Sequence, residues 1–206
     1  MFERIYNRFS QKSKQRWREG SIQRCLKVTA KPLAIVIFLF FIGGFAPPQK
    51  KLAVGEHEIK AVFLFNFAQF VEWPPEVLPD PNSPIIIGIL GKDPFGAFLE
   101  ETIQGEEVNG HPLVIQHYSN VKQIKSCHIL FIHPSLTPRL DNILNALKGK
   151  GILTVSDGSD FIKQGGMIRF IKESNKIKLQ VNLSVVKSSD ITISSKLLRL
   201  SEIVEN

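Results

Sequence analysis

Between residues 56 and 73 the apolar positions recur every three or four residues, a spacing that predicts an amphipathic helix. The apolar stripe consists of Ile59, Val62, Phe63, Phe67, Phe70 and Val71. Asn66 falls within this stripe, and because an unsatisfied buried amide costs about 1–3 kcal/mol, we expect it to bond to the backbone of a neighbouring element. Phe65 falls on the opposite, polar side, where we expect an exposed ring. Pro74 disfavours helical geometry at Trp73 and ends the helix there.

The next part of the chain alternates short apolar runs with helical patterns. Residues 85–90 are apolar apart from one glycine, as expected of a strand that is buried on both faces. Asp93 and Pro94 suit the cap and the first residue of a helix. The predicted elements are strands at 85–90, 112–118, 127–133 and 151–155, helices at 94–103 and 136–148, and a helical turn at 160–163.

The last forty residues have a different pattern. Two strand-like runs, 167–171 and 176–181, are separated by a short polar segment, which predicts a hairpin. Apolar residues at helical spacing follow a serine pair and predict a closing helix over 194–204. Together these elements predict an α/β fold with a mostly parallel sheet, helices on both of its faces, and a late antiparallel hairpin.

Charge is distributed unevenly along the 206 residues. The net charge of +7 lies entirely in residues 1–46, which hold nine basic and two acidic residues, whereas the remainder holds 17 of each. Residues 33–46 carry no charge; this run is shorter than the about 20 apolar residues of a membrane-spanning helix and typical of a signal peptide. We therefore predict a leader at 1–46 that is a signal peptide or a short membrane anchor, a linker at 47–55 and a domain at 56–206. Because that domain is neutral, nucleic-acid binding is not expected.

Candidate chemistry is sparse. In open α/β sheets, ligands bind at the carboxyl ends of the strands. The loops predicted there supply the candidate lining of a small-ligand crevice, which is Lys92, Asp93, His133, Ser156 and Asp157. Asp93 and Asp157 are more simply explained as helix caps. The sequence contains no nucleophile elbow, phosphate-binding loop or zinc-protease motif, and its five histidines form no local cluster, so we predict no catalytic residue, metal or cofactor.

Cys127 is the single cysteine of the predicted domain, because Cys25 lies in the leader. No disulfide can therefore form within the domain. Its place at the start of a core strand favours a small buried apolar residue, and a redox role or an intermolecular disulfide is the alternative.

Several segments, in the same order, resemble the YfiR-like family of exported bacterial proteins. The first, residues 60–74, is the opening helix with its closing F-V-E-W-P. The others are residues 87–96, 127–132, 153–157, 165–168, 176–182 and 194–200. The resemblance implies a periplasmic, homodimeric regulator that binds the periplasmic sensory domain of an inner-membrane diguanylate cyclase and represses it, which lowers cyclic-di-GMP signalling. The disulfides of the family's named member have no counterpart here.

On this interpretation, residues on and after the first helix are candidate partner contacts: Phe65, Gln69, Glu72 and Trp73. Asn66 and Asn182 are structural polar residues. The alternative function is a periplasmic module that binds a small ligand and feeds a sensor kinase or a transporter, with the ligand in the crevice described above. An enzyme is the least supported class.

Overall fold

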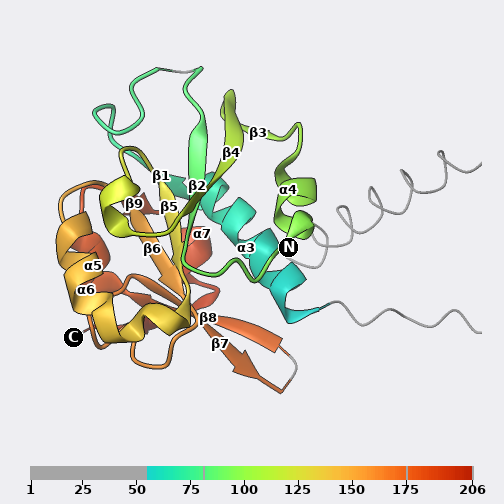
Figure 1. Cartoon of the computed structure of the whole chain (residues 1–206). Coiled ribbons are helices and arrows are strands. Elements are labelled where there is room, and N and C mark those ends of the chain that lie inside the picture. Colours follow the sequence, from blue (N-terminus) through green and yellow to red (C-terminus); the bar gives the residue numbers. More distant parts are fainter. Residues whose placement is uncertain (1–54, 81, 175, 206) are drawn as a thin grey trace, which may run out of the picture. The chain divides into compact units, whose positions relative to one another are not determined.

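The computed structural model describes residues 55–80, 82–174 and 176–205 (Figure 1). The predicted leader, with its signal peptide or anchor, and the predicted linker up to residue 54 lie outside these residues. Within the described part of the chain, no helix is long and apolar enough to span a membrane.

An eight-stranded sheet forms the centre of the domain, in the order β10-β8-β7-β6-β5-β2-β4-β3. Its strands are β2 (Ile85–Leu90), β3 (Glu107–Val108), β4 (His111–Tyr118), β5 (Ile129–Ile132), β6 (Leu153–Ser156), β7 (Ile168–Glu173), β8 (Lys176–Asn182) and β10 (Ser201–Val204). Strands β4, β2, β5, β6 and β7 run parallel, and β7 and β8 form an antiparallel hairpin. The predicted mostly parallel sheet with a late hairpin is confirmed.

The order of the parallel strands is that of a doubly wound sheet. From β2 the chain moves to β4 on one side, and then crosses back to β5, β6 and β7 on the other side. The connections that follow β2 and β5 therefore lead to opposite faces, and in such sheets ligands bind where this reversal occurs, outside the carboxyl ends of the strands.

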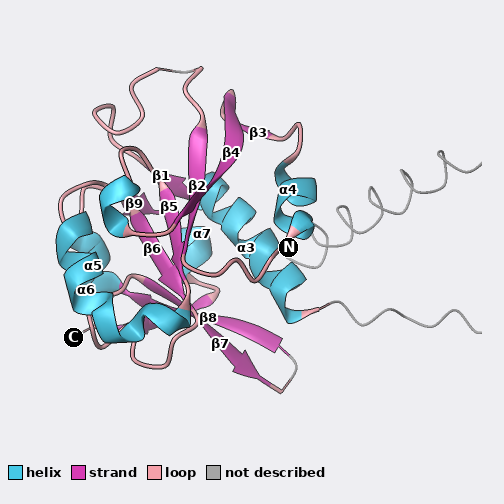
Figure 2. Cartoon of the chain, in the orientation of Figure 1, coloured by secondary structure: helices cyan, strands magenta, loops and turns pink. Residues whose placement is uncertain are grey.

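Helices cover both faces of the sheet, as predicted (Figure 2). Helices α3 (Glu56–Phe70) and α4 (Ala97–Ile103) contact one another and pack on one face, and α5 (Leu140–Leu147) packs on the other. The shorter helical segments are η1 (Val121–Gln123), η2 (Pro134–Arg139), α6 (Leu183–Lys187) and α7 (Ser195–Leu198).

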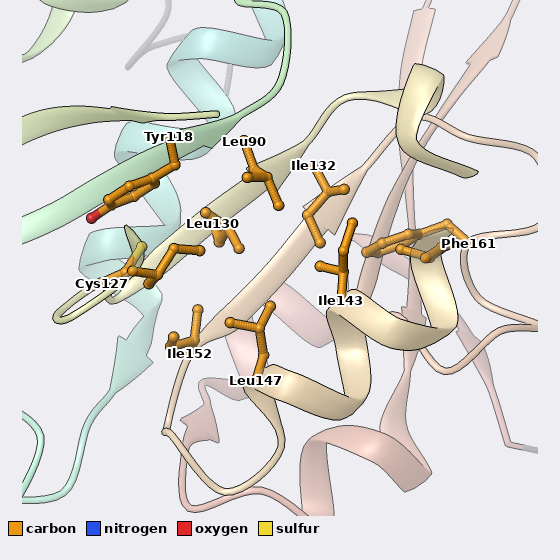
Figure 3. Packing of buried hydrophobic residues seen from close by; sticks show 11 residues of the cluster. Leu90, Tyr118, Cys127, Leu130, Ile132, Ile143, Leu147, Ile152 and Phe161 are labelled. Carbon is orange, nitrogen blue, oxygen red and sulfur yellow. The ribbon is translucent and has the colours of Figure 1, made fainter. Parts of the chain in front are cut away.

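The two cores are separated by the alternation of side chains along each strand. Leu130 and Ile132 of β5 point toward α5, where they join the cluster that contains Ile143 (Figure 3). Phe131 lies between them in sequence and points to the other face, where its ring meets that of Phe95 edge-on at 4.9 Å. Both faces of β5 are thus buried, which explains its uninterrupted apolar sequence.

Two of the predicted helices end earlier in the structure than the sequence predicts. The first ends at Phe70 rather than residue 73, because β1 (Val71–Glu72) pairs antiparallel with β9 (Thr192–Ile193) in a separate two-stranded ribbon. The predicted closing helix over 194–204 is also wrong. Its helical part, α7, is four residues long, and Ser201–Val204 instead forms β10. The free edge of β8 offers backbone partners that local periodicity does not reveal, and Ile203 pairs there with Val181.

Two other helices start later than predicted. Asp93 does act as a cap, since its Oδ1 accepts hydrogen bonds from the backbone N–H groups of Phe95 and Gly96, but these bonds close a turn and α4 begins only at Ala97. The helix predicted at 136–148 begins as the 3₁₀ segment η2, which contains Pro138. Proline has no N–H to donate inside an α-helix, so α5 starts after it.

Candidate functional site

The predicted partner contacts on α3 are only partly on the surface. Phe65 is 2% exposed, so the expectation of an exposed ring is wrong. Helix α3 contacts both the sheet and α4, and residues 60–62 and 64–68 are all buried, so the helix is enclosed through its middle instead of half-exposed. Gln69 and Glu72 are exposed and Trp73 is half-buried.

Asn66 is fully buried, and neither its Oδ1 nor its Nδ2 has a hydrogen-bond partner among the described residues. The expected bond to a neighbouring backbone is therefore wrong. Trp73 Nε1 and Ser194 Oγ, which lie near each other in the fold, are also buried without a partner in the described part of the chain. Ser194 lies next to the end of α3, because its N–H donates to the carbonyl of Phe70. The C-terminal end of α3 and the β1–β9 ribbon thus hold several unpaired buried polar groups.

Asn182 differs from Asn66, although both amides are buried. Its Oδ1 accepts a hydrogen bond from the N–H of Val185 and so caps α6. Its Nδ2 donates to the carbonyl of Ile162 at 3.4 Å. Asn182 therefore ties the end of β8 to the loop before β7.

A buried lysine forms the most extensive charged cluster on the helix. Lys60 is 2% exposed, and its Nζ lies 2.6 Å from Glu56 Oε1 and 2.5 Å from Asp157 Oδ2. Glu56 Oε2 in turn lies 2.8 Å from the Nζ of Lys172 on the β7–β8 hairpin. Two carboxylates thus surround the buried ammonium, and the network ties the first turn of α3 to the end of β6 and to the hairpin.

This network changes the titration of Glu56. Hydrogen bonds from Lys172 and then from Lys60 favour the ionised carboxylate and lower the pKa of Glu56 from 4.5 to about 2. The network was missed in the sequence, although Glu56 and Lys60 have the four-residue spacing of a helical ion pair. The contact with Asp157 spans 97 positions, so only the fold reveals it.

The five predicted crevice residues make separate contacts. Asp93 Oδ2 lies 3.0 Å from His117 Nε2, a residue that the sequence did not single out. His133 caps η2, since its Nδ1 accepts from the N–H of Ser135. Ser156 Oγ donates to the carbonyl of Ile132. Asp157 pairs with Lys60 as described above, and Lys92 is exposed.

A pocket does lie at the predicted edge, but other residues line it. Its volume is about 170 Å³, and it lies between η1 and the η2–α5 segment beside the carboxyl ends of β2 and β4. The lining residues are Leu90, Ser119, Asn120, Val121, Leu136, Arg139, Asn142 and Ile143. This is the edge at which the predicted α/β sheet would bind a ligand, because loops gather at the carboxyl ends of parallel strands.

Cys127 is buried, 3% exposed, just before β5 and so at the amino end of the parallel strands. Burial raises the pKa of its thiol to about 12, so the thiol is protonated at neutral pH. Its Sγ packs over Gly88, where an added Cβ would lie only 2.7 Å from the sulfur. A thiolate that could attack a disulfide needs exposure and a lowered pKa, and this environment supplies neither.

His128 is buried at the start of β5 and bonds to backbone on both sides. Its Nδ1 accepts from the N–H of Ile86 and its Nε2 faces the carbonyl of Val77 at 3.3 Å, which fixes the neutral tautomer with the proton on Nε2. Burial lowers the pKa of His128 below 6.5. Within the residues that the structure covers, no three His, Cys, Asp or Glu side chains gather as metal ligands.

The fold and these sites define a doubly wound α/β domain with a buried charge network on its first helix and a small pocket at the carboxyl edge of its sheet. The chain belongs to the YfiR/HmsC-like family, whose model matches residues 57–202. The match includes the pocket and all of the network except Glu56, which lies one residue before it. A comparison with curated proteins found no match.

Proposed function

We propose that this protein is an exported regulator that binds the periplasmic domain of an inner-membrane diguanylate cyclase, represses it and so lowers cyclic-di-GMP. The observation that carries this proposal is the family match over residues 57–202, nearly the whole described domain. The protein acts by binding, without catalysis or cofactor, and works in the periplasm after export through its leader. Repression requires that it bind the inactive state of the cyclase more tightly than the active state, because only that difference shifts the equilibrium.

The proposed contact surface is the β1–β9 ribbon with the end of α3. Gln69 and Glu72 are exposed there, and Thr192, the register partner of Glu72, is exposed beside them. Trp73 is half-buried, and its ring lies edge-on against His128 at 5.6 Å. A rigid aromatic residue that is partly accessible among polar neighbours suits the centre of a protein interface. Phe65 is left out because it is buried.

Self-association is proposed at the edge of the eight-stranded sheet. Strand β10 lies at the edge of the sheet, and Leu200 and Ile203 are about half exposed there. The outer edge of such a strand presents free backbone N–H and C=O groups beside exposed apolar side chains, which favours pairing with another strand. A second copy of the chain would supply that strand. Ile203→Lys should convert a dimer into a monomer in analytical ultracentrifugation.

The test of the regulatory role combines a deletion strain with capture from membranes. Deletion should raise cyclic-di-GMP, and the tagged full chain should co-purify a diguanylate cyclase from membranes. Glu72→Lys should abolish both repression and capture. Glu100→Lys is the matched control, because Glu100 is exposed on α4, away from the ribbon. Unchanged cyclic-di-GMP after deletion, with no cyclase captured, would reject the proposal.

A further inference from the structure

The pocket between η1 and α5 is not used by the regulatory contact proposed above. We propose that it binds a small organic anion, a monocarboxylate with a compact apolar body. The inference rests on where the pocket lies, which groups line it and how large it is, and it does not require a cyclase partner.

The position follows from the strand order. Ligands of doubly wound sheets bind outside the carboxyl ends of the strands, here the ends of β2, β4 and β5. The gap between the loops after β2 and β5 is filled, because Leu136 packs on Gly91. Gly91 has a φ of +91°, and an added Cβ there would lie 3.1 Å from Leu136 Cδ1. The open space lies next to this contact, on the β4 side, where Ser119 and Asn120 follow the strand.

The charge of the lining favours an anion. Arg139 is the one charged residue that lines the pocket, and no acidic residue does. In the described part of the chain, no hydrogen bond or ion pair joins the side chain of Arg139 or of Asn142 to another residue. A guanidinium presents paired N–H donors that match a carboxylate, and the Asn142 amide adds another donor.

The apolar floor of the pocket and its volume determine the size and the apolar part of the ligand. Leu90 and Ile143 are buried beneath the pocket, and Val121 and Leu136 form partly buried apolar walls. A cavity of about 150 Å³ accommodates benzene, and this pocket has a volume of about 170 Å³. The ligand is therefore about the size of a single ring or a branched chain, with its carboxylate at Arg139 and its apolar part on the floor.

The experiment is calorimetric titration of the purified full chain with benzoate and with benzamide, its neutral counterpart. Benzoate should bind, and benzamide should bind about tenfold more weakly, because it lacks the charge that Arg139 recognises. Arg139→Gln should weaken benzoate binding about tenfold. Arg199→Gln is the matched control, since Arg199 is also an exposed arginine next to a short helix but bonds to Ser195 and lies outside the pocket. It should leave benzoate binding unchanged.

A second variant tests the location without removing the charge. Asn142→Trp places an indole over the pocket from an exposed helical position and should abolish benzoate binding, with the thermal midpoint kept. Three results would each overturn the proposal: no heat with benzoate up to millimolar concentration, equal affinity for benzoate and benzamide, or equal affinity in Arg139→Gln. Capture of a cyclase from membranes does not depend on these results, so the two proposals fail separately.

Discussion

The two ends of α3 treat buried polar groups in opposite ways. At the N-terminal end, the ammonium of Lys60 is buried, but it lies between the carboxylates of Glu56 and Asp157. At the C-terminal end, the neutral amide of Asn66 is buried, and within residues 55–80, 82–174 and 176–205 neither of its polar atoms nor Ser194 Oγ nearby has a hydrogen-bond partner. The buried charge is therefore paired, although Asp157 Oδ1 has no hydrogen-bond partner among the described residues, whereas the buried amide of Asn66 is not paired at either atom.

This difference separates structural from adaptable parts of the domain. A buried charge is stable only beside groups of opposite charge. Removing one partner of the pair leaves the other as an uncompensated charge, which destabilises the folded protein. The network therefore fixes α3 to β6 and to the hairpin. An unpaired amide costs stability without fixing any contact, so Asn66 contributes no polar contact that fixes the end of α3. The surface on which we place the partner contact lies at this end of the helix.

The largest expected effect is that of Lys60→Met. The substitution leaves Asp157 without its cation, and breaking a buried ion pair in this way destabilises proteins by about 3–5 kcal/mol. Because Asp157 is 21% exposed and water can reach it, we expect a loss near the lower end, about 3 kcal/mol. Urea unfolding of the full chain would measure it.

Lys172→Met is the matched control, since Lys172 pairs with the same Glu56 but its side chain is 60% exposed. Exposed ion pairs contribute little, so the loss should stay under about 1 kcal/mol. Adding Asp157→Asn to Lys60→Met should recover part of the lost stability. Equal losses for the two lysine variants would show that burial of Lys60 is not what makes its contacts important.

The second effect is a dependence of the free energy of unfolding on pH below about 4.5. The pKa of Glu56 is lowered in the folded protein from 4.5 to about 2, so the unfolded chain takes up a proton first as the pH falls. Its contribution is full above about pH 4.5 and is lost between there and about pH 2. Glu56→Gln should be less stable near neutral pH and should flatten this part of the curve of unfolding free energy against pH. Lys172→Met, which removes the largest cause, should move the loss to higher pH; an unshifted curve would contradict the assignment.

The third effect concerns the unpaired end. Leucine has nearly the shape of asparagine and no polar atoms, so Asn66→Leu should raise the free energy of unfolding by about 1 kcal/mol. The matched control is Asn182→Leu, which removes an amide that makes two hydrogen bonds, and it should cost about 1–3 kcal/mol. If Asn66→Leu destabilised the protein as much as Asn182→Leu, Asn66 would have partners in solution.

The comparison also shows what the sequence could reveal. The parallel sheet and the hairpin follow from apolar runs such as residues 85–90, because a strand buried on both faces has few other compositions. The end of the last helix was mispredicted because the pairing of Ile203 with Val181 depends on a sheet edge that forms elsewhere in the chain. Local periodicity describes one element at a time and contains no information about such partners.

The candidate site divides in the same way. The predicted open α/β sheet favoured its carboxyl edge as the place for a ligand, and a pocket lies at that edge. Which side chains line the pocket depends on how η1 and α5 pack, so the sequence did not reveal Arg139 as a lining residue. For the same reason Asp157 was expected in the crevice, whereas it pairs with Lys60. The burial of Phe65 was missed for a related reason, since periodicity cannot show that a helix is covered on more than one side.

The smallest expected effect is at Ser194, the residue before α7. Replacing a serine that caps a helix by alanine lowers the free energy of unfolding by about 1 kcal/mol. Ser194 makes no side-chain cap bond, and its Oγ is buried without a partner among the described residues. Ser194→Ala should therefore change the free energy of unfolding by less than about 0.5 kcal/mol. Asn120→Ala removes a side-chain oxygen that does accept from the N–H of Lys122, and it should cost about 1 kcal/mol. A loss at Ser194 equal to that at Asn120 would mean that its hydroxyl is bonded in solution, and the contrast between the two ends of α3 would then rest on Asn66 and Trp73 alone.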